Sequence, residues 1–195
     1  MNKNFEIIEK RTGKLVFKSF PKKEWYNIIF LHIWLLGWLF GELIAIDTLF
    51  FNNSYFNFET NIEDADDLFL IVWLFFWTIG GVHAFIYLAW ILFGEEEVII
   101  ESKQISITRI LAFFSRSRYF ENELIVNFRI KIEKDTNYSR RKKANSFLSN
   151  YGSLRFNYKG KEVKFGLDLS RADSELVYNS IKEISRFTNL NLKLE

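Results

Sequence analysis

Two long apolar runs divide the chain into regions of opposite character. Residues 25–51 and 68–93 contain nearly all of the continuous apolar sequence, whereas residues 1–24 and 94–195 are polar and charged. At about 1.5 Å of rise per residue, a helix over either run is longer than the roughly 30 Å hydrocarbon core of a bilayer. The pattern therefore predicts two transmembrane helices, and the first is expected to stay as an anchor because it is too long for a cleaved signal peptide.

The charges that flank the apolar runs predict how the chain crosses the membrane. The segment 52–67 between the runs contains several Asp and Glu residues but no Lys or Arg, and basic residues gather before the first run and after the second. Basic residues favour the cytoplasmic side of a membrane. We therefore expect an acidic external loop at 52–67, a multi-pass protein of the bacterial inner (plasma) membrane, and both termini in the cytoplasm.

Small residues on the two predicted helices indicate where the helices pack against each other. Gly37 and Gly41 form a GxxxG pattern in the first run, and Gly80, Gly81 and Ala84 form a small patch in the second. Small residues allow helix backbones to approach closely in a membrane. We interpret the two sets as the contact surfaces of an intramolecular helical hairpin.

One acidic residue lies deep in the first apolar run. Glu42 is placed roughly 6 Å from the expected bilayer centre, where a charge is costly and marks either a functional site or a buried partner. It lies about 100° to 140° around the helix from Gly41 and Gly37, so it is expected to point away from the second helix if the glycines face that helix. His83 is a candidate hydrogen-bonding partner.

Three interpretations of Glu42 remain open. It is a protonated acid that is satisfied within the hairpin, a docking residue for another membrane subunit or a second copy, or a proton carrier.

The polar C-terminal region, residues 94–195, alternates apolar and polar residues with a period of two, which predicts β-strands. The expected strands are 97–101, 104–110, 118–121, 124–133, 151–158 and 162–167. Residues 158–161, with the sequence Tyr-Lys-Gly-Lys, have the composition of a hairpin turn between the last two strands.

A helix is expected to close this region. Ser170 and Asp173 have the spacing of a capping box, with Asp in place of the usual Glu. An apolar stripe at helical spacing follows at Leu176, Val177, Ile181, Ile184 and Phe187. We interpret this stripe as core packing.

The N-terminal arm, residues 1–24, also has the pattern of a β-hairpin. Strands are expected at 5–9 and 15–20, with a turn at 11–14. A lone two-stranded hairpin is marginally stable in water, so we expect the arm to join the sheet of the C-terminal region. The predicted fold is an α-helical membrane hairpin inserted between the second and third strands of an α+β cytoplasmic domain with seven or eight antiparallel strands.

Successive short strands lead into the closing helix of this domain, as at 94–100, 105–109 and 163–167 before Ser170. This order resembles the bacterial pleckstrin-homology-like (PH-like) domains, and the two-span layout is similar to that of the small photosystem I assembly proteins. The resemblance implies an antiparallel β-sheet or barrel with a C-terminal helix. It also implies a family whose members act as scaffolds, assembly factors or lipid-proximal binding modules.

A run of four consecutive bases lies in the polar loop 134–150. It consists of Arg140, Arg141, Lys142 and Lys143. At about 1 kcal/mol per base near an anionic leaflet, the run is a candidate for holding the domain against the membrane surface, and a solvated loop is the alternative.

A second candidate for lipid contact precedes the third expected strand. Phe113 and Phe114 are followed by Arg116 and Arg118. An apolar loop tip flanked by bases can enter the headgroup region of a membrane, whereas the alternative is that the phenylalanines belong to the core.

The composition limits the chemistry of the polar regions. The chain has no Cys, and its only histidines, His32 and His83, lie in the apolar runs. Disulfides, thiolate nucleophiles and cysteine-ligated zinc are therefore excluded. No Gly-rich phosphate loop, GxSxG or HExxH motif is present, so we expect no enzyme activity, cofactor, metal or small-molecule substrate. No nucleic-acid-binding motif is found either.

These observations favour a non-catalytic, membrane-anchored scaffold, adaptor or assembly subunit of a larger membrane complex. Its expected partners are the lipid bilayer and either other membrane subunits or a second copy. Two alternatives are an anionic-lipid-binding PH-like module and a component of a proton-driven membrane device that uses Glu42.

Overall fold

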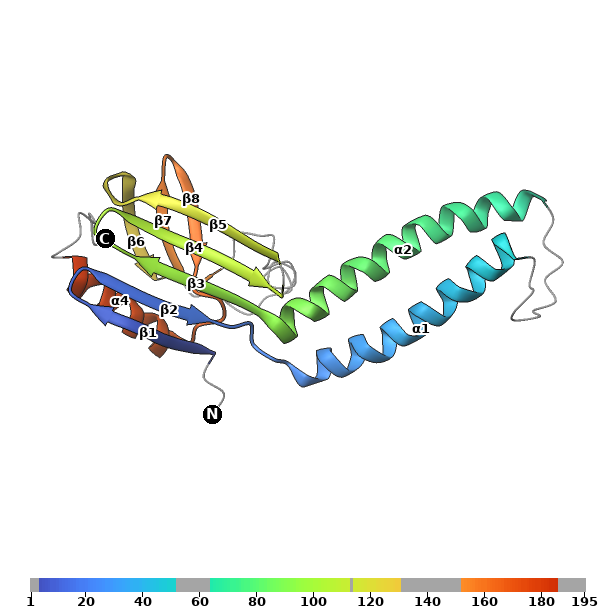
Figure 1. Cartoon of the computed structure of the whole chain (residues 1–195), viewed down its shortest axis with the longest axis horizontal. Coiled ribbons are helices and arrows are strands. Elements are labelled where there is room, and N and C mark those ends of the chain that lie inside the picture. The colour runs from blue at the N-terminus through green and yellow to red at the C-terminus, as the bar shows by residue number, and fades with distance from the viewer. Residues whose placement is uncertain (1–3, 52–63, 113, 131–151, 186–195) are drawn as a thin grey trace. The chain divides into compact units, whose positions relative to one another are not determined.

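The computed structural model describes residues 4–51, 64–112, 114–130 and 152–185 (Figure 1). The chain divides into two compact units. Residues 23–89 form a helical unit, and residues 1–22 together with 90–195 form a second unit. The described part of the second unit is built mainly from β-strands.

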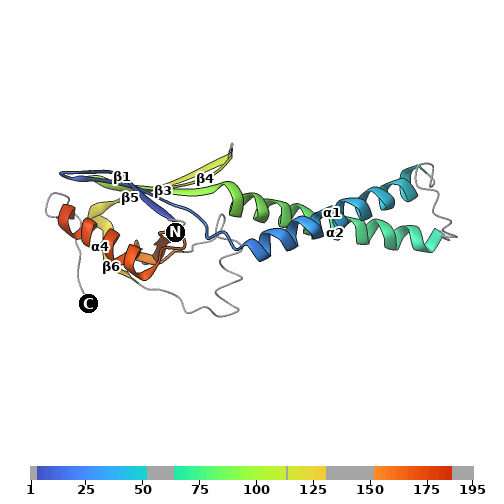
Figure 2. The ribbon, with the colours of Figure 1, turned by 90° about the horizontal axis from the view of Figure 1, so that it is seen from below.

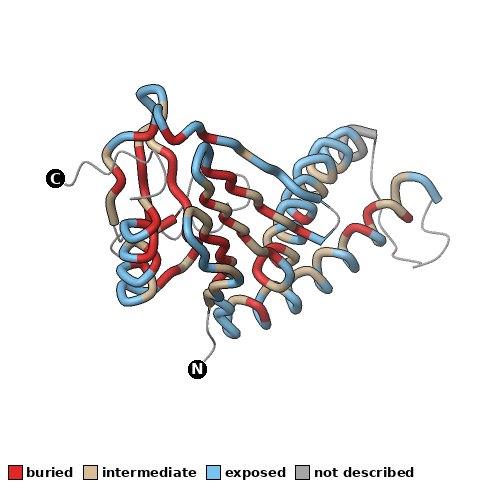
Figure 3. Tube along the Cα trace, turned by 60° about the vertical axis from the view of Figure 1, so that its left-hand side comes forward, coloured by how far each residue is buried: buried red, intermediate tan, exposed pale blue. Residues whose placement is uncertain are grey.

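The helical unit contains two long helices, α1 (Trp25–Phe50) and α2 (Asp64–Phe93). Both are long and apolar enough to cross a membrane, and little of either is buried by the protein itself. In Figure 3 α1 and α2 are mostly blue and tan, and most of the red lies in the second unit. A helix that is apolar on all sides needs protein or lipid around it. The two helices match the two apolar runs, although α2 begins at Asp64 instead of residue 68.

The described part of the second unit contains two antiparallel sheets and one α-helix. Its elements are β1 (Phe5–Arg11), β2 (Lys14–Ser19), β3 (Gly94–Ile100), β4 (Gln104–Leu111), β5 (Phe114–Glu121), a 3-10 turn (Asn122–Leu124), β6 (Ile125–Ile130), β7 (Leu154–Tyr158), β8 (Lys161–Phe165) and α4 (Arg171–Ser185). The sheet orders are β1-β2-β3-β4-β5 and β6-β7-β8. This is the antiparallel α+β arrangement that the sequence predicts, with the apolar helices inserted between β2 and β3.

The N-terminal arm is part of the larger sheet. Residues 15–19 of β2 pair with residues 96–100 of β3, and the core-facing side chains of Leu15 and Phe17 are fully buried. The chain therefore leaves the sheet before α1 and returns to the same sheet immediately after α2.

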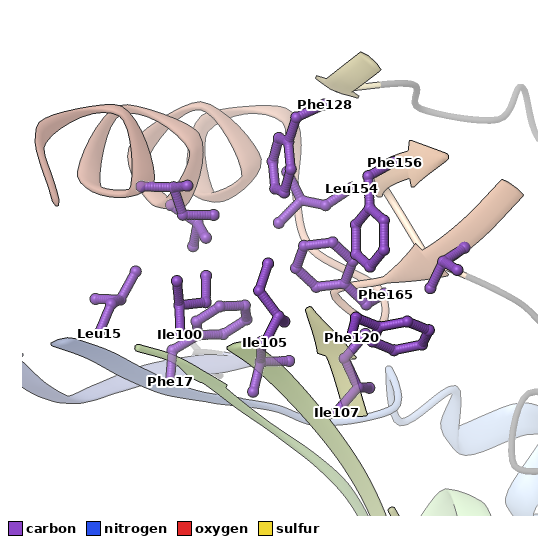
Figure 4. Close-up of a cluster of buried hydrophobic side chains, with 14 of the residues drawn as sticks. Leu15, Phe17, Ile100, Ile105, Ile107, Phe120, Phe128, Leu154, Phe156 and Phe165 are labelled. Carbon is purple, nitrogen blue, oxygen red and sulfur yellow. The ribbon is translucent and has the colours of Figure 1, made fainter. Parts of the chain in front are cut away.

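The core lies between the two sheets and is closed by α4, which lies on the same side of the larger sheet as β6 (Figure 2). Residues of the larger sheet that contribute to the core include Leu15, Phe17, Ile100, Ile105 and Ile107, and those of the smaller sheet include Phe128, Leu154, Phe156 and Phe165 (Figure 4). From α4, Val177, Ile181 and Ile184 are buried as predicted. The prediction was wrong for Leu176, which is 48% exposed.

The turns explain where the strands begin and end. Lys159 and Gly160 both have a positive φ, 49° and 77°, as a type I′ hairpin turn requires, so the predicted turn at 158–161 is confirmed. The β4–β5 hairpin closes earlier than predicted, because Leu111 pairs with Phe114. As a result β5 begins at Phe114 instead of residue 118. The predicted strand 124–133 is described only as far as Ile130.

Candidate functional site

Glu42 makes its contact within the helical hairpin. Its side chain is buried, with 9% of the residue exposed, and Oε1 lies 2.5 Å from Oγ1 of Thr78 on α2. The Thr78 hydroxyl also lies 2.8 Å from the backbone oxygen of Leu74. A hydroxyl has one hydrogen to donate. The Thr78 hydroxyl therefore donates to one of these two oxygens at a time, the Glu42 carboxyl or the Leu74 carbonyl.

The expectation that Glu42 points away from α2 was wrong. A side chain at Gly37 would meet nothing within 4 Å, and one at Gly41 would lie 3.9 Å from Trp77. Gly37 therefore faces outward, and the contact surface of α1 is rotated from the GxxxG face toward Glu42. This contact is the one expected for an acid satisfied within the hairpin, while docking and proton transfer by Glu42 stay predictions.

Tryptophan side chains, which the sequence analysis did not use, form much of the hairpin contact. The rings of Trp73 and Trp77 stack at 4.8 Å between centroids, and Trp34 lies 6.0 Å from Trp77. Trp38 donates from Nε1 to the backbone oxygen of Trp77 at 3.1 Å. The sequence contains a pattern that indicates this contact face, because Trp34, Trp38 and Glu42 recur at intervals of four residues and so share one face of a helix.

The small patch on α2 contributes unequally to this contact. A side chain at Gly81 would overlap the ring of Trp38, whereas one at Gly80 would meet nothing within 4 Å. Ala84 is half-buried and His83 is exposed. Of the predicted packing residues, the structure therefore brings Gly41 and Gly81 to the interface and leaves Gly37 and Gly80 on the surface.

The two adjacent glycines of α2 allow a matched test of the hairpin. Gly81→Val is expected to destabilise the helix pair by about 1–3 kcal/mol, because the new side chain displaces Trp38. Gly80→Val makes the same chemical change in open space and is expected to leave stability almost unchanged. Detergent-induced unfolding followed by tryptophan fluorescence measures both. Equal destabilisation by the two variants would contradict the packing described here.

A basic rim occupies the β4–β5 edge of the larger sheet, and we define it as Phe114, Arg116 and Arg118. In β5 these alternate residues lie on one face of the sheet, the face on which Phe120 enters the core. Arg116 pairs across the ladder with Arg109, and Phe114 pairs with Leu111. The rim is therefore the continuation of the core-facing surface beyond the point where the apolar core ends.

The electrostatics of the rim favour an additional negative charge. Burial and the neighbouring positive charges of Arg109 and Arg116 lower the pKa of Arg118, and Glu96 acts in the opposite direction. Glu96 already accepts a bond from Arg109 Nε at 2.8 Å, so its charge is shared. An anion beside Arg116 and Arg118 would relieve the repulsion between these guanidinium groups.

The predicted lipid-proximal residues have different outcomes. Phe114 is 72% exposed and Arg116 is exposed, so the alternative in which Phe114 belongs to the core is wrong. Arg118 is half-buried and its guanidinium lies 5.8 Å from the ring centroid of Phe120. Phe113 lies outside the described residues, and so does the whole run Arg140, Arg141, Lys142 and Lys143.

Polar bonds, two of them buried, hold the two connections to the helical unit. Glu96, two residues into β3, accepts from the backbone N–H of Gly166 at 2.6 Å. Ser19, at the end of β2, accepts from the backbone N–H of Leu167 at 3.1 Å. The backbone N–H of Lys22 donates to Asp168 at 2.8 Å. One loop of the domain therefore binds both the segment before α1 and the segment after α2.

A second charged group lies on the outer face of the smaller sheet. Glu162 is bonded to Arg129 at 2.6 Å, to Arg155 at 3.3 Å and to Lys164 at 3.5 Å. Burial acts to raise the pKa of Glu162, but the combined attraction of these three bases outweighs it and leaves the pKa below its usual value. Glu162 is therefore ionised at neutral pH and neutralises part of the positive charge around it.

Within the part of the chain that the structure describes, no cluster of three or more Asp, Glu or His side chains is placed to hold a metal ion. Comparison of the chain with protein-family models, with curated proteins and with solved structures finds no match. The geometry therefore defines the class: two helices long and apolar enough to cross a membrane, joined to an antiparallel α+β domain that carries a basic rim.

Proposed function

We propose that this protein is a non-catalytic, membrane-anchored adaptor. Its hairpin holds it in the bilayer, and its PH-like domain contacts anionic lipid headgroups through the basic rim and presents its remaining surface for assembly of a larger complex. The support for the fold is the succession of a five-stranded sheet, a three-stranded sheet and a C-terminal helix around one core. The resemblance to PH-like domains implies antiparallel strands that lead into a C-terminal helix, and this succession agrees with that order.

The observation that carries the proposal is the register of the strands beside the rim. Gly94 follows the last residue of α2 directly and pairs with Leu111, which in turn pairs with Phe114. Two strand spacings of about 4.8 Å separate Phe114 from the end of that helix, a distance of roughly 10 Å. If α2 crosses a bilayer, the strand pairing alone brings Phe114 and Arg116 close to the headgroups.

The same sheet supports the proposed orientation of the chain. Because β2 pairs with β3, the residues before α1 and after α2 belong to one domain on one side of the membrane. The acidic segment between the helices and the basic residues outside them then favour a cytoplasmic domain and cytoplasmic termini in a bacterial inner membrane.

A spin label tests the lipid contact in the full chain. The protein has no Cys, so Ser115→Cys provides a unique site for a nitroxide on β5, on the opposite face of the strand from its neighbours Phe114 and Arg116. In vesicles that contain phosphatidylglycerol, we expect the label to collide with membrane-soluble oxygen more than with a water-soluble nickel complex. In phosphatidylcholine alone the preference should fall. A label at Lys159→Cys, in the exposed β7–β8 turn, should stay water-accessible in both.

Neutralising the rim gives the matched control. Arg116→Ser together with Arg118→Ser removes two bases worth about 1 kcal/mol each near an anionic surface, so lipid contact should weaken roughly 30-fold. Arg11→Ser together with Arg171→Ser removes the same charge from two exposed side chains elsewhere and should change little. Contact that is equally strong without anionic lipid, or after rim neutralisation, would refute the proposed lipid-binding surface.

A further inference from the structure

A groove of about 570 Å³ lies between the N-terminal strand and the closing helix of the domain. It is lined by Phe5, Glu6, Ile7, Phe20, Asp173 and Leu176. Farther along the same two elements, Lys10 of β1 is bonded to Glu183 of α4 at 2.7 Å. The ion pair therefore joins β1 to α4 at one end. The groove lies at the other end, beside the first residues of β1.

Among the described strands, β1 is paired on one side only. β1 is an edge strand that pairs only with β2 among the described strands. The N–H of Phe20 donates to the carbonyl of Asn4 at 2.8 Å, which makes residues 4 and 20 a hydrogen-bonded pair. Hydrogen-bonded pairs alternate along an antiparallel ladder. The N–H and C=O groups of Phe5 and Ile7 therefore point to the free edge, while their side chains line the groove.

The lining also selects the charge of an occupant. The charged residues among the six are Glu6 and Asp173, and none of the six is basic. Leu176 provides an apolar wall that the core does not use, since it is 48% exposed. An added strand with apolar residues at alternate positions would place them against Phe5, Ile7 and Leu176. Its intervening basic residues would lie on the other face of β1, beside Glu6, which pairs across the ladder with Lys18.

We propose that this groove is a docking site for an extended segment of a partner protein, which adds to β1 as a strand and carries alternating apolar and basic residues. Strand addition supplies backbone hydrogen bonds, and the groove supplies the selection of side chains. The proposal rests on the proposed adaptor function and deepens it, because it assigns the surface and the chemistry by which the adaptor recognises its partner.

The test uses the full chain in nanodiscs of zwitterionic lipid, with empty nanodiscs as the blank. The probe is a seven-residue, end-capped, fluorescent peptide of alternating valine and lysine, and the comparison peptide has glutamate in place of lysine. Fluorescence anisotropy should show at least tenfold tighter binding of the lysine peptide. Because the whole chain has a formal net charge of +2, its overall charge does not account for that preference.

A variant of the groove separates this site from the rest of the surface. Leu176→Arg changes a half-exposed wall residue and should weaken binding of the lysine peptide at least tenfold. Val126→Arg makes a comparable change at a residue of β6 that is 40% exposed and should leave binding unchanged. Bound peptide should also slow hydrogen exchange of the Phe5 and Ile7 amides, as expected for strand addition.

Two results would overturn the proposal: equal binding of the lysine and glutamate peptides, or undiminished binding to Leu176→Arg. Failure of the groove is distinguishable from failure of the lipid-binding surface. Leu176→Arg should leave the lipid contact of the Ser115→Cys label intact, and neutralising Arg116 and Arg118 should leave peptide binding intact.

Discussion

Replacing Glu96 with alanine is expected to destabilise the domain by about 3–5 kcal/mol, a large part of the stability of an ordinary domain. Glu96 is fully buried and receives bonds from Arg109 at 2.8 Å and from the Gly166 N–H at 2.6 Å. Without the carboxylate, the Arg109 guanidinium, which is itself buried, keeps its charge and loses this partner. Hydrogen exchange of the strand amides in the full chain, held in detergent micelles, measures the loss.

Glu97 provides the control for this prediction. It is the next residue of β3, and its carboxylate lies 3.8 Å from Lys18 on the partly exposed face of the sheet. An ion pair of this kind contributes about 1 kcal/mol or less, so Glu97→Ala should change exchange only slightly. Similar losses in the two variants would show that the Glu96 bonds are not what holds β3 to the loop at Gly166.

Phe165→Ala should destabilise the domain by a similar amount, about 3–5 kcal/mol, for a different reason. Phe165 is fully buried and joins the two sheets, with ring centroids 5.7 Å from Phe128, 5.7 Å from Phe156 and 6.4 Å from Phe17. Truncation leaves a cavity that residues from two sheets would have to fill together. Thermal unfolding of the domain, followed by near-ultraviolet circular dichroism, reports the loss.

An exposed phenylalanine serves as the matched comparison for this variant. Phe114 is 72% exposed, so Phe114→Ala removes the same ring without opening a cavity and should leave the unfolding temperature almost unchanged. The helical unit should keep its far-ultraviolet signal in both variants, since neither residue belongs to that unit. A large loss of stability in Phe114→Ala would contradict its assignment to a surface rim.

The Glu96 prediction also concerns the two segments that connect the domain to the helices. The loop that Glu96 binds also binds Ser19 and Lys22, which lie just before α1. Breaking the Glu96 bonds should therefore loosen both segments that join the domain to the hairpin.

The sequence by itself determined the elements whose signal is local. Long apolar runs, period-two alternation, a Lys-Gly turn and a Ser-Asp capping box each depend on neighbouring residues, and the corresponding helices, strands and hairpin turn are present in the structure. The N-cap bond of the predicted box is formed, since Ser170 Oγ accepts from the Asp173 N–H at 3.1 Å, and Ser170 Oγ also donates to the Asp173 carboxylate at 2.7 Å. The insertion of the apolar helices between β2 and β3 was likewise predictable from chain order.

Only the tertiary structure decided which residues meet across elements. The face of α1 that contacts α2 depends on how the tryptophan side chains fit between the helices, so glycine spacing alone misplaced Glu42, whose partner Thr78 is 36 residues away. Packing between distant segments likewise determines the buried ion pair of Glu96 and Arg109, the exposure of Leu176 and the edge position of β1 among the described strands. Alternating apolar and polar residues indicate that a strand has two different faces, but only the neighbouring elements determine which part of each face is covered.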